Sequence, residues 1–305
     1  MNAPSILCPV DFSEASRSAL SYAAAIADHF GAHLTVLSVD DPLLADAAAA
    51  AGLSPGLADE TRCELQRFCS EALSHRRAGA RTIDYLVATG KPALEILRAA
   101  RELKADLIVI SSRGRSGLRK MFLGSTTERV LREAPVPVLI TSGDPPLATS
   151  LSEIGRHLNR VLAPVDLSPV SRHQVVLAHG IAQALSIPLM VAHVVEPVFV
   201  PSRVREALRG ADAARRTHAH ERLSALAETI DPKAELMVLT GDPSEEIATL
   251  AGARGASLIV MGLHSSEPGG PRMGSVTYRV LCLAHVLVLA IPPKAVAAPA
   301  AVAGG

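Results

Sequence analysis

The chain contains Ser5-Ile-Leu-Cys-Pro-Val-Asp-Phe-Ser13 and repeats this pattern as Arg160-Val-Leu-Ala-Pro-Val-Asp-Leu-Ser168. Each copy is a short apolar run, typical of a buried strand, followed by polar residues that can start a helix. Further pairs recur at nearly the same spacing: Thr89-Gly-Lys-Pro92 with Thr240-Gly-Asp-Pro243, and Gly124-Ser125 with Gly274-Ser275. A repeat of about 150 residues has the size of a whole domain, so the sequence predicts two tandem copies of one domain.

The repeat also predicts the domain boundaries. We expect the first domain at residues 1–142 and the second at residues 159–292. Residues 143–158 include Gly143, Pro145 and Pro146, which break regular elements, so we expect a linker there. The Ala- and Pro-rich residues 293–305 are expected to form a disordered tail.

Predicted strands and helices alternate within each copy. In the first copy we expect strands at 6–10, 34–39, 82–88, 107–110 and 136–140, with helices at 13–31, 58–77, 92–103 and 125–132. In the second copy we expect strands near 161–165, 189–194, 235–239, 258–261 and 286–289. The alternation predicts two α/β domains, each with a doubly wound, five-stranded parallel sheet of Rossmann-like type. Ligands of such sheets bind at the carboxyl ends of the strands.

The composition argues against several classes of protein. The 305 residues include 30 Lys and Arg against 30 Asp and Glu, so the basic surplus typical of nucleic-acid binders is missing. The longest apolar candidate, Val280–Ile291, is too short for a membrane span, which needs about 20 residues. The first residues, Met1 to Pro4, do not resemble a signal peptide. Four cysteines without a CxxC pair argue against a disulfide framework: Cys8, Cys63, Cys69 and Cys282. We expect a cytoplasmic protein that binds neither nucleic acid nor membrane.

A glycine-rich, basic loop follows the fourth predicted strand. It reads Ser111-Ser-Arg-Gly114-Arg-Ser-Gly117-Leu-Arg-Lys-Met-Phe-Leu-Gly124-Ser125-Thr126. Glycines allow backbone amides to approach an anion closely, and a helix that starts at Ser125 would present further free amides to phosphate. Four cations stand in the loop without an acid: Arg113, Arg115, Arg119 and Lys120. The alternative interpretation is a glycine turn followed by a capping box, Ser125-x-x-Glu128.

Two commoner phosphate-binding motifs do not fit the loop. The chain has no GxxxxGK[ST] sequence, which a P-loop requires. Ser112-x-Gly114-x-x-Gly117 imitates a dinucleotide fingerprint, but it follows the fourth strand instead of the first and begins with Ser.

Over nearly its whole length the chain resembles the universal stress protein family, as two tandem copies. The resemblance rests on Pro9-Val-Asp11, on Gly90-x-Pro92 and on the basic loop. The ATP-binding members carry G-x2-G-x9-G-[ST], and the first copy matches three of these four positions, with Ser111 in place of the first Gly. The second copy reads Gly262-x2-Ser265-x8-Gly274-Ser275, so it is one residue short and lacks the middle Gly. Its loop also contains Pro268 and Pro271, which have no amide hydrogen.

The resemblance implies a fold of the adenine nucleotide alpha hydrolase type and a set of binding residues. Val10 and Asp11 would meet the adenine, with Val39 beside the base or the ribose. The whole predicted site in the first copy comprises Pro9, Val10, Asp11, Val39, Ser111, Gly114, Gly124, Ser125 and Thr126. The second copy offers a weaker candidate site of Pro164, Val165, Asp166, Gly262, Gly274 and Ser275. The implied ligand is ATP, with AMP or ADP as alternatives and with Mg²⁺ as a companion ion.

Two residues of the predicted site carry an alternative interpretation. Asp11 is also suited to cap the helix that follows it. If the backbone at Ser111 required a positive φ, Ser would cost on the order of 1 kcal/mol there.

Two functions from different classes remain open. The first is a module that binds adenine nucleotide in stress response or signalling, with the nucleotide held by the first copy. The second is a nucleotide-free scaffold of the same fold. The loop cations favour binding, whereas Ser111 and the altered second loop favour the scaffold. For either we expect a homodimer or a pairing of the two domains. No general base or metal-binding carboxylate pair is evident, so we expect slow ATP hydrolysis at most.

Overall fold

The computed structural model describes residues 3–50, 52, 54–74, 82–112, 114, 123–142, 158–198, 210–263 and 273–292. These residues divide into two compact units, one before residue 143 and one after residue 157. The predicted tail and nearly all of the predicted linker lie outside the described residues. So do all four loop cations, Arg113, Arg115, Arg119 and Lys120, and the second-copy positions Ser265, Pro268 and Pro271.

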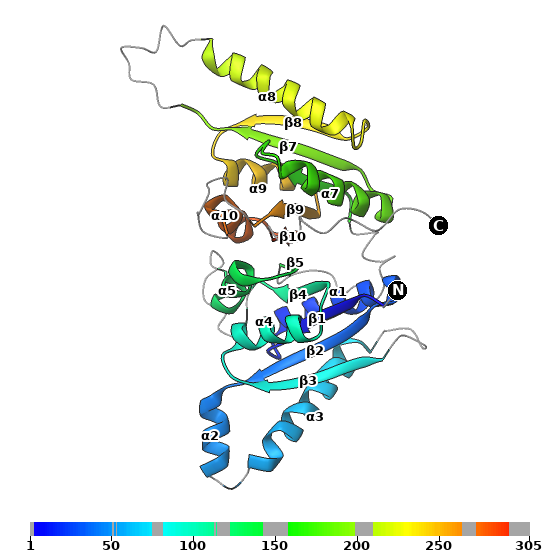
Figure 1. Ribbon diagram of the computed structural model, residues 1–305, viewed down its shortest axis with the longest axis vertical. Coiled ribbons are helices and arrows are strands. Elements are labelled where there is room, and N and C mark those ends of the chain that lie inside the picture. Colours follow the sequence, from blue (N-terminus) through cyan, green and yellow to red (C-terminus); the bar gives the residue numbers. More distant parts are fainter. Residues whose placement is uncertain are drawn as a thin grey trace. The chain divides into compact units, whose positions relative to one another are not determined.

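The first unit alternates strands and helices along the chain (Figure 1). Its elements are β1 (Ser5–Pro9), α1 (Glu14–Phe30), β2 (His33–Asp40), α2 (Pro42–Ala50), α3 (Ser54–Ala72), β3 (Ile83–Thr89), α4 (Pro92–Glu102), β4 (Leu107–Ser111), α5 (Ser125–Glu133) and β5 (Val138–Thr141). The strands lie parallel in the order β3-β2-β1-β4-β5. Helices α1 and α3 cover one face of this sheet, and α4 and α5 cover the other. The strand order reverses between β1 and β4, which is where such sheets bind their ligands.

Local sequence explains why α1 starts and stops where it does. Ser13 caps its start, because the Ser13 hydroxyl oxygen accepts a hydrogen bond from the Ser16 amide at 3.2 Å. Gly31 follows its end in the left-handed conformation with φ 62°, which glycine adopts without steric cost. Between these residues, small side chains such as Ala19 and Ala23 are fully buried and let α1 pack closely on the sheet.

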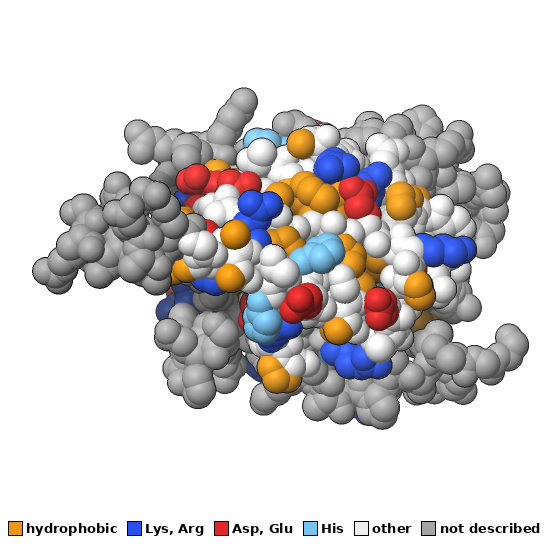
Figure 2. Space-filling view, turned by 90° about the horizontal axis from the view of Figure 1, so that it is seen from above, with side chains coloured by type: hydrophobic (Ala, Val, Ile, Leu, Met, Phe, Trp, Pro, Cys, Tyr) orange, Lys and Arg blue, Asp and Glu red, His pale blue; other side chains and the backbone are white. Residues whose placement is uncertain are grey.

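The second unit repeats this architecture. Its elements are β6 (Val161–Pro164), α7 (Ser171–Leu185), β7 (Leu189–Val195), α8 (Ala211–Glu228), β8 (Glu235–Thr240), α9 (Pro243–Ala253), β9 (Leu258–Gly262), α10 (Ser275–Leu283) and β10 (Leu287–Ile291). The strands lie parallel in the order β8-β7-β6-β9-β10. Figure 2 shows a face on which basic, acidic, histidine and hydrophobic side chains are interspersed among the described residues.

The predicted fold class is confirmed: both units are α/β, and each has five parallel strands. One helix was not predicted, α2 (Pro42–Ala50), and α3 starts at Ser54 instead of the expected residue 58. Among the described residues, no helix has the length and apolar character that crossing a bilayer requires.

Candidate functional site

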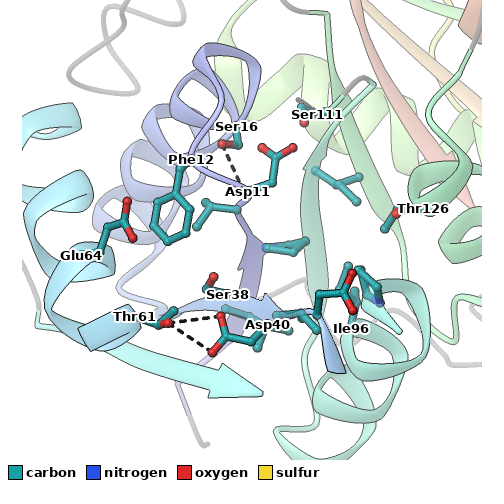
Figure 3. Close-up of a pocket in the computed structure, with 18 of the residues that line it drawn as sticks. Asp11, Phe12, Ser16, Ser38, Asp40, Thr61, Glu64, Ile96, Ser111 and Thr126 are labelled. Atoms are coloured by element: carbon teal, nitrogen blue, oxygen red, sulfur yellow. Dashed lines mark hydrogen bonds between the residues drawn. The ribbon is translucent and has the colours of Figure 1, made fainter. Parts of the chain in front are cut away.

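A cavity of about 1310 Å³ opens at the carboxyl ends of β1, β2 and β4 in the first unit (Figure 3). The nine residues of the predicted first site all line it: Pro9, Val10, Asp11, Val39, Ser111, Gly114, Gly124, Ser125 and Thr126. Three strand ends and the start of α5 contribute these residues, and they span more than 100 positions of the sequence. The fold therefore brings together the residues that the resemblance implied as one site.

The turn after β1 forms one wall of the cavity. Phe12 adopts a left-handed backbone with φ 62°, a conformation that costs a bulky residue on the order of 1 kcal/mol. Its ring packs edge-on against Phe68 of α3, with the centroids 5.5 Å apart, and the Arg17 guanidinium lies 4.8 Å from the Phe68 centroid. This packing holds the turn, and the turn aims Asp11 at the cavity.

Asp11 is not the helix cap, which corrects one of the two interpretations of this residue. Its Oδ1 accepts hydrogen bonds from the Ser13 amide at 3.2 Å and from the Ser13 hydroxyl at 2.6 Å, and Ser13 itself caps α1. The other carboxylate oxygen faces Gly114. A Cβ atom added at Gly114 would lie 2.5 Å from Asp11 Oδ2, so a larger residue would force one of them to move. Gly114 does not have a positive φ, so the close approach of the Asp11 carboxylate is what distinguishes glycine from a larger residue at this position.

The start of α5 forms the opposite wall. Its N-cap residue is Gly124, with φ −61° and ψ 140°, and no side chain in the described part of the chain caps the helix. The alternative interpretation as a capping box is wrong, because Gly124 and not Ser125 is the N-cap residue, and Glu128 forms an ion pair with Arg132 at 2.7 Å. The first turn, Ser125 and Thr126, lines the cavity, so this helix terminus presents its dipole and amides to the cavity.

Ser111 is compatible with this arrangement. It is the last residue of β4, paired with Thr141 of β5, and it is not among the described residues with positive φ. The strain considered for Ser at this position therefore does not arise. Its carbonyl oxygen accepts a hydrogen bond from the Thr127 hydroxyl at 2.9 Å, which ties the start of α5 to the end of β4.

Asp40, at the end of β2, is a cavity residue that the sequence analysis missed. It is only 9% exposed, and both of its carboxylate oxygens lie within 3.2 Å of the Thr61 hydroxyl of α3. Burial raises the pKa of Asp40; the hydrogen bond from Thr61 opposes the rise, and the nearby charge of Glu64 adds to it. Asp40 follows directly after the predicted strand at 34–39 and belongs to no motif in the sequence. Its counterpart in the repeat is apolar, and that contrast could have drawn attention to it.

The two sides of the cavity differ in charge. The side formed by the end of β2 and by α3 is lined by four acids and one base among the described residues: Asp40, Asp41, Glu60, Glu64 and Arg67. The α5 side presents an uncapped helix N-terminus. A ligand with one anionic end and one neutral end would thus orient with its anionic end at α5.

In the second unit, side chains donate hydrogen bonds to backbone carbonyl oxygens at or near the strand ends. Gln174 Nε2 donates to the carbonyl oxygens of Pro164 and Val260 at 2.6 and 2.9 Å. His193 Nδ1 donates to the Val165 carbonyl oxygen at 2.8 Å. His193 stands at the position of Ser38, since Ser38 pairs with Val87 of β3 and His193 pairs with Val238 of β8.

The remaining residues of the candidate second site keep the framework of the first. Asp166 Oδ1 accepts hydrogen bonds from the Ser168 amide and the Ser171 hydroxyl, both at 2.9 Å. α10 begins at Ser275 after Gly274, and the Gly262 carbonyl oxygen accepts a hydrogen bond from the Thr277 hydroxyl at 3.0 Å. The duplicated framework is therefore intact, while its inner polar groups bond to the chain's own side chains.

Comparison with known proteins agrees with this architecture. The model of the universal stress protein family matches residues 3–142 and again residues 157–292. A universal stress protein of Mycolicibacterium smegmatis is 26% identical over 303 residues, covering 95% of this chain and 97% of its own. A universal stress protein of Thermus aquaticus is 36% identical over 138 residues, which cover 44% of this chain and 96% of its own. A solved universal stress protein from Archaeoglobus fulgidus superposes with a TM-score of 0.63 at 22% identity, covering 95% of this chain and 97% of its own.

Proposed function

Because the chain belongs to the universal stress protein family, we propose that its first unit binds an adenine nucleotide in the cavity at the ends of β1, β2 and β4. The observation that carries the proposal is the convergence of all nine predicted residues on that cavity. ATP is the ligand of first choice, with AMP and ADP as alternatives, and Mg²⁺ would enter bound to the phosphates. The bound nucleotide acts in stress response or signalling, and its hydrolysis is slow or absent.

The orientation of the nucleotide follows from the charges of the cavity. The phosphates lie at the start of α5, with Ser125 and Thr126 around them. The nucleoside lies towards Asp11 and the end of β2. The acids on the α3 side disfavour the reverse orientation, because they would repel the phosphates.

The second unit is proposed to be structural and not to bind nucleotide. Three side chains support this: His193 and Gln174 hydrogen-bond to its strand ends, and the Arg222 guanidinium donates to the Leu167 carbonyl oxygen at 2.6 Å. Because these carbonyl oxygens already accept hydrogen bonds within the chain, they have less acceptor capacity to offer a nucleotide.

Cysteine labelling tests where the nucleotide binds. Cys63 is exposed and lines the cavity, whereas the half-buried Cys282 lies on α10 of the second unit. We expect saturating ATP to slow the alkylation of Cys63 by iodoacetamide several-fold and to leave Cys282 unchanged, as measured by mass spectrometry of the full chain. Unchanged labelling of Cys63, or protection of Cys282 instead, would count against the proposal.

A further inference from the structure

The carboxylate of Asp40 has acceptor capacity that the described residues do not use. An ionised carboxylate has about four acceptor positions, whereas a hydroxyl donates a single hydrogen. Among the described residues, the Thr61 hydroxyl is the donor to Asp40. Figure 3 shows this pair at the β2 end of the cavity, away from Ser111 and Thr126. A buried carboxylate that lines a cavity with acceptor positions to spare fits a ligand that supplies a donor.

The second unit shows that the fold does not need a carboxylate here. Asp40 pairs with Thr89 across the sheet, and Val195 pairs with Thr240 in the same way. The next glycine confirms the equivalence, since the Gly90 amide donates to the Asp40 carbonyl oxygen, as the Gly241 amide does to that of Val195. The end of the second strand is therefore acidic in one unit and apolar in the other.

The buried faces of the helices that pack against these strands differ in the same sense. On α3, buried residues follow at every fourth position: Thr61, Leu65 and Cys69. On α8 the buried series is Ala219, Leu223 and Ala227, which contains no hydroxyl. Val195 and Ala219 are buried without a polar group, and burying a carboxylate is unfavourable unless it is well hydrogen-bonded. The Asp40–Thr61 pair thus has no structural necessity.

The charge around Asp40 decides which part of a nucleotide can face it. Glu64 adds a like charge, and Glu60 and Asp41 line the same side of the cavity, where Arg67 is the one base among the described lining residues. Phosphate would be repelled there, whereas an uncharged hydroxyl or amino group would donate to the carboxylate.

We propose that Asp40, positioned by Thr61, is a specificity-determining residue that accepts a hydrogen bond from an uncharged donor on the nucleoside, either a ribose hydroxyl or the amino group of the base. The inference rests on the proposed function, since it concerns the same cavity. It goes further by naming the residue that distinguishes nucleosides and the chemistry that this residue recognises.

The test compares nucleotide selectivity in the full chain. The double variant Asp40→Val/Thr61→Ala replaces the polar pair by apolar side chains, and Val is the residue that the second unit has at the position of Asp40. The control is Asp59→Ala, which removes one negative charge from the same helix at a residue that does not line the cavity. The probes are ATP, 2′-deoxy-ATP, 3′-deoxy-ATP and ITP, which lacks the amino group, each titrated by calorimetry. A hydrogen bond to a charged group corresponds to a factor of about ten or more in affinity.

We expect the unmodified chain and Asp59→Ala to bind one of the three analogues about tenfold more weakly than ATP. In the double variant, ATP should weaken until this gap closes. A gap for a deoxy analogue identifies a ribose hydroxyl as the donor, and a gap for ITP identifies the amino group. Circular dichroism checks the fold, and Asp40→Asn, which keeps the shape of the side chain, serves as a second variant with the gap again reduced.

The inference is overturned if the unmodified chain shows no gap for any analogue, or if both Asp40 variants keep every ratio of the unmodified chain. These results would leave the proposed function standing, because ATP would still bind and still protect Cys63. Failure of the proposed function looks different: the unmodified chain would bind none of the four nucleotides, and the inference would fall with it.

Discussion

The close approach of Gly114 to Asp11 predicts the effect of adding one methyl group at residue 114. In Gly114→Ala the new Cβ would lie 2.5 Å from Asp11 Oδ2, so either the carboxylate or the loop must shift. Because both line the cavity, we expect the affinity for ATP to fall about tenfold, the equivalent of roughly 1.4 kcal/mol. Isothermal titration calorimetry of the full chain measures this change.

Gly180→Ala is the matched control for that substitution. Gly180 lies within α7, and nothing comes within 4 Å of an added Cβ. The variant should bind ATP like the unmodified chain and gain about 0.5–1 kcal/mol in its free energy of unfolding, since Ala favours a helix over Gly. Equal ATP affinity in both glycine variants would show that the Asp11 contact does not matter for binding.

Asp40 predicts a pH dependence of stability without ligand. Its pKa is raised above the ordinary value of 3.8, chiefly by burial, so the folded chain retains this proton where the unfolded chain has lost it. The contribution of Asp40 to stability is therefore most favourable below pH 3.8 and is lost as the pH rises through its raised pKa. We expect the free energy of unfolding of the unmodified chain, relative to Asp40→Asn, to decrease with rising pH. Urea unfolding of both proteins across the acidic range checks the slope, and a difference that rises with pH would contradict the assignment.

At the scale of residues, the sequence predicted the site residues that belong to a motif. It did not predict the residues whose role depends on contacts in the folded chain. The glycines and the Ser-Thr start of α5 could be selected because motif spacing identifies them. The role of Asp40 could not, because its burial is created by α3, which packs over the strand end from elsewhere in the chain. The close approach of Gly114 to Asp11 is likewise a property of the folded chain.

The start of α5 and the start of α10 are equivalent elements with different proposed roles, and one substitution in each distinguishes them. Gly124→Arg places a long side chain where phosphate would approach the α5 amides, so ATP binding should be lost while the circular dichroism spectrum is unchanged. Gly274→Arg makes the same change before α10 and should leave ATP binding as it was. Retained affinity in Gly124→Arg, or lost affinity in Gly274→Arg alone, would show that the proposal places the site in the wrong unit.

Elements were predicted well where periodicity is strong. All ten strands lie within a few residues of their expected positions, because short β-branched runs between turn residues are distinctive. The helix α2 was missed because Pro42–Ala50 is almost entirely Ala and Leu, without the alternation of polar and apolar faces that marks a surface helix. In the described part of this helix, the apolar residue Leu43 is 75% exposed, so its hydrophobicity does not mark a buried face.

Duplication is the feature that most shapes the whole molecule. Both units keep the strand order, the left-handed residue after the first strand and the Thr hydroxyl that ties the fourth strand to the next helix. They differ in the residues that face the strand ends, Ser38 and Asp40 in one unit against His193 and Val195 in the other. Both units have thus retained the framework, while the residues at their strand ends have diverged.

The stoichiometry of nucleotide binding tests the central claim most directly. Calorimetric titration of the full chain with ATP is predicted to give one site per chain, because one unit has a lined cavity at an uncapped helix and the other has its strand ends bonded internally. The single site should disappear in Gly124→Arg. Two sites per chain would contradict the assignment of the second unit, and no binding at all would favour the nucleotide-free scaffold.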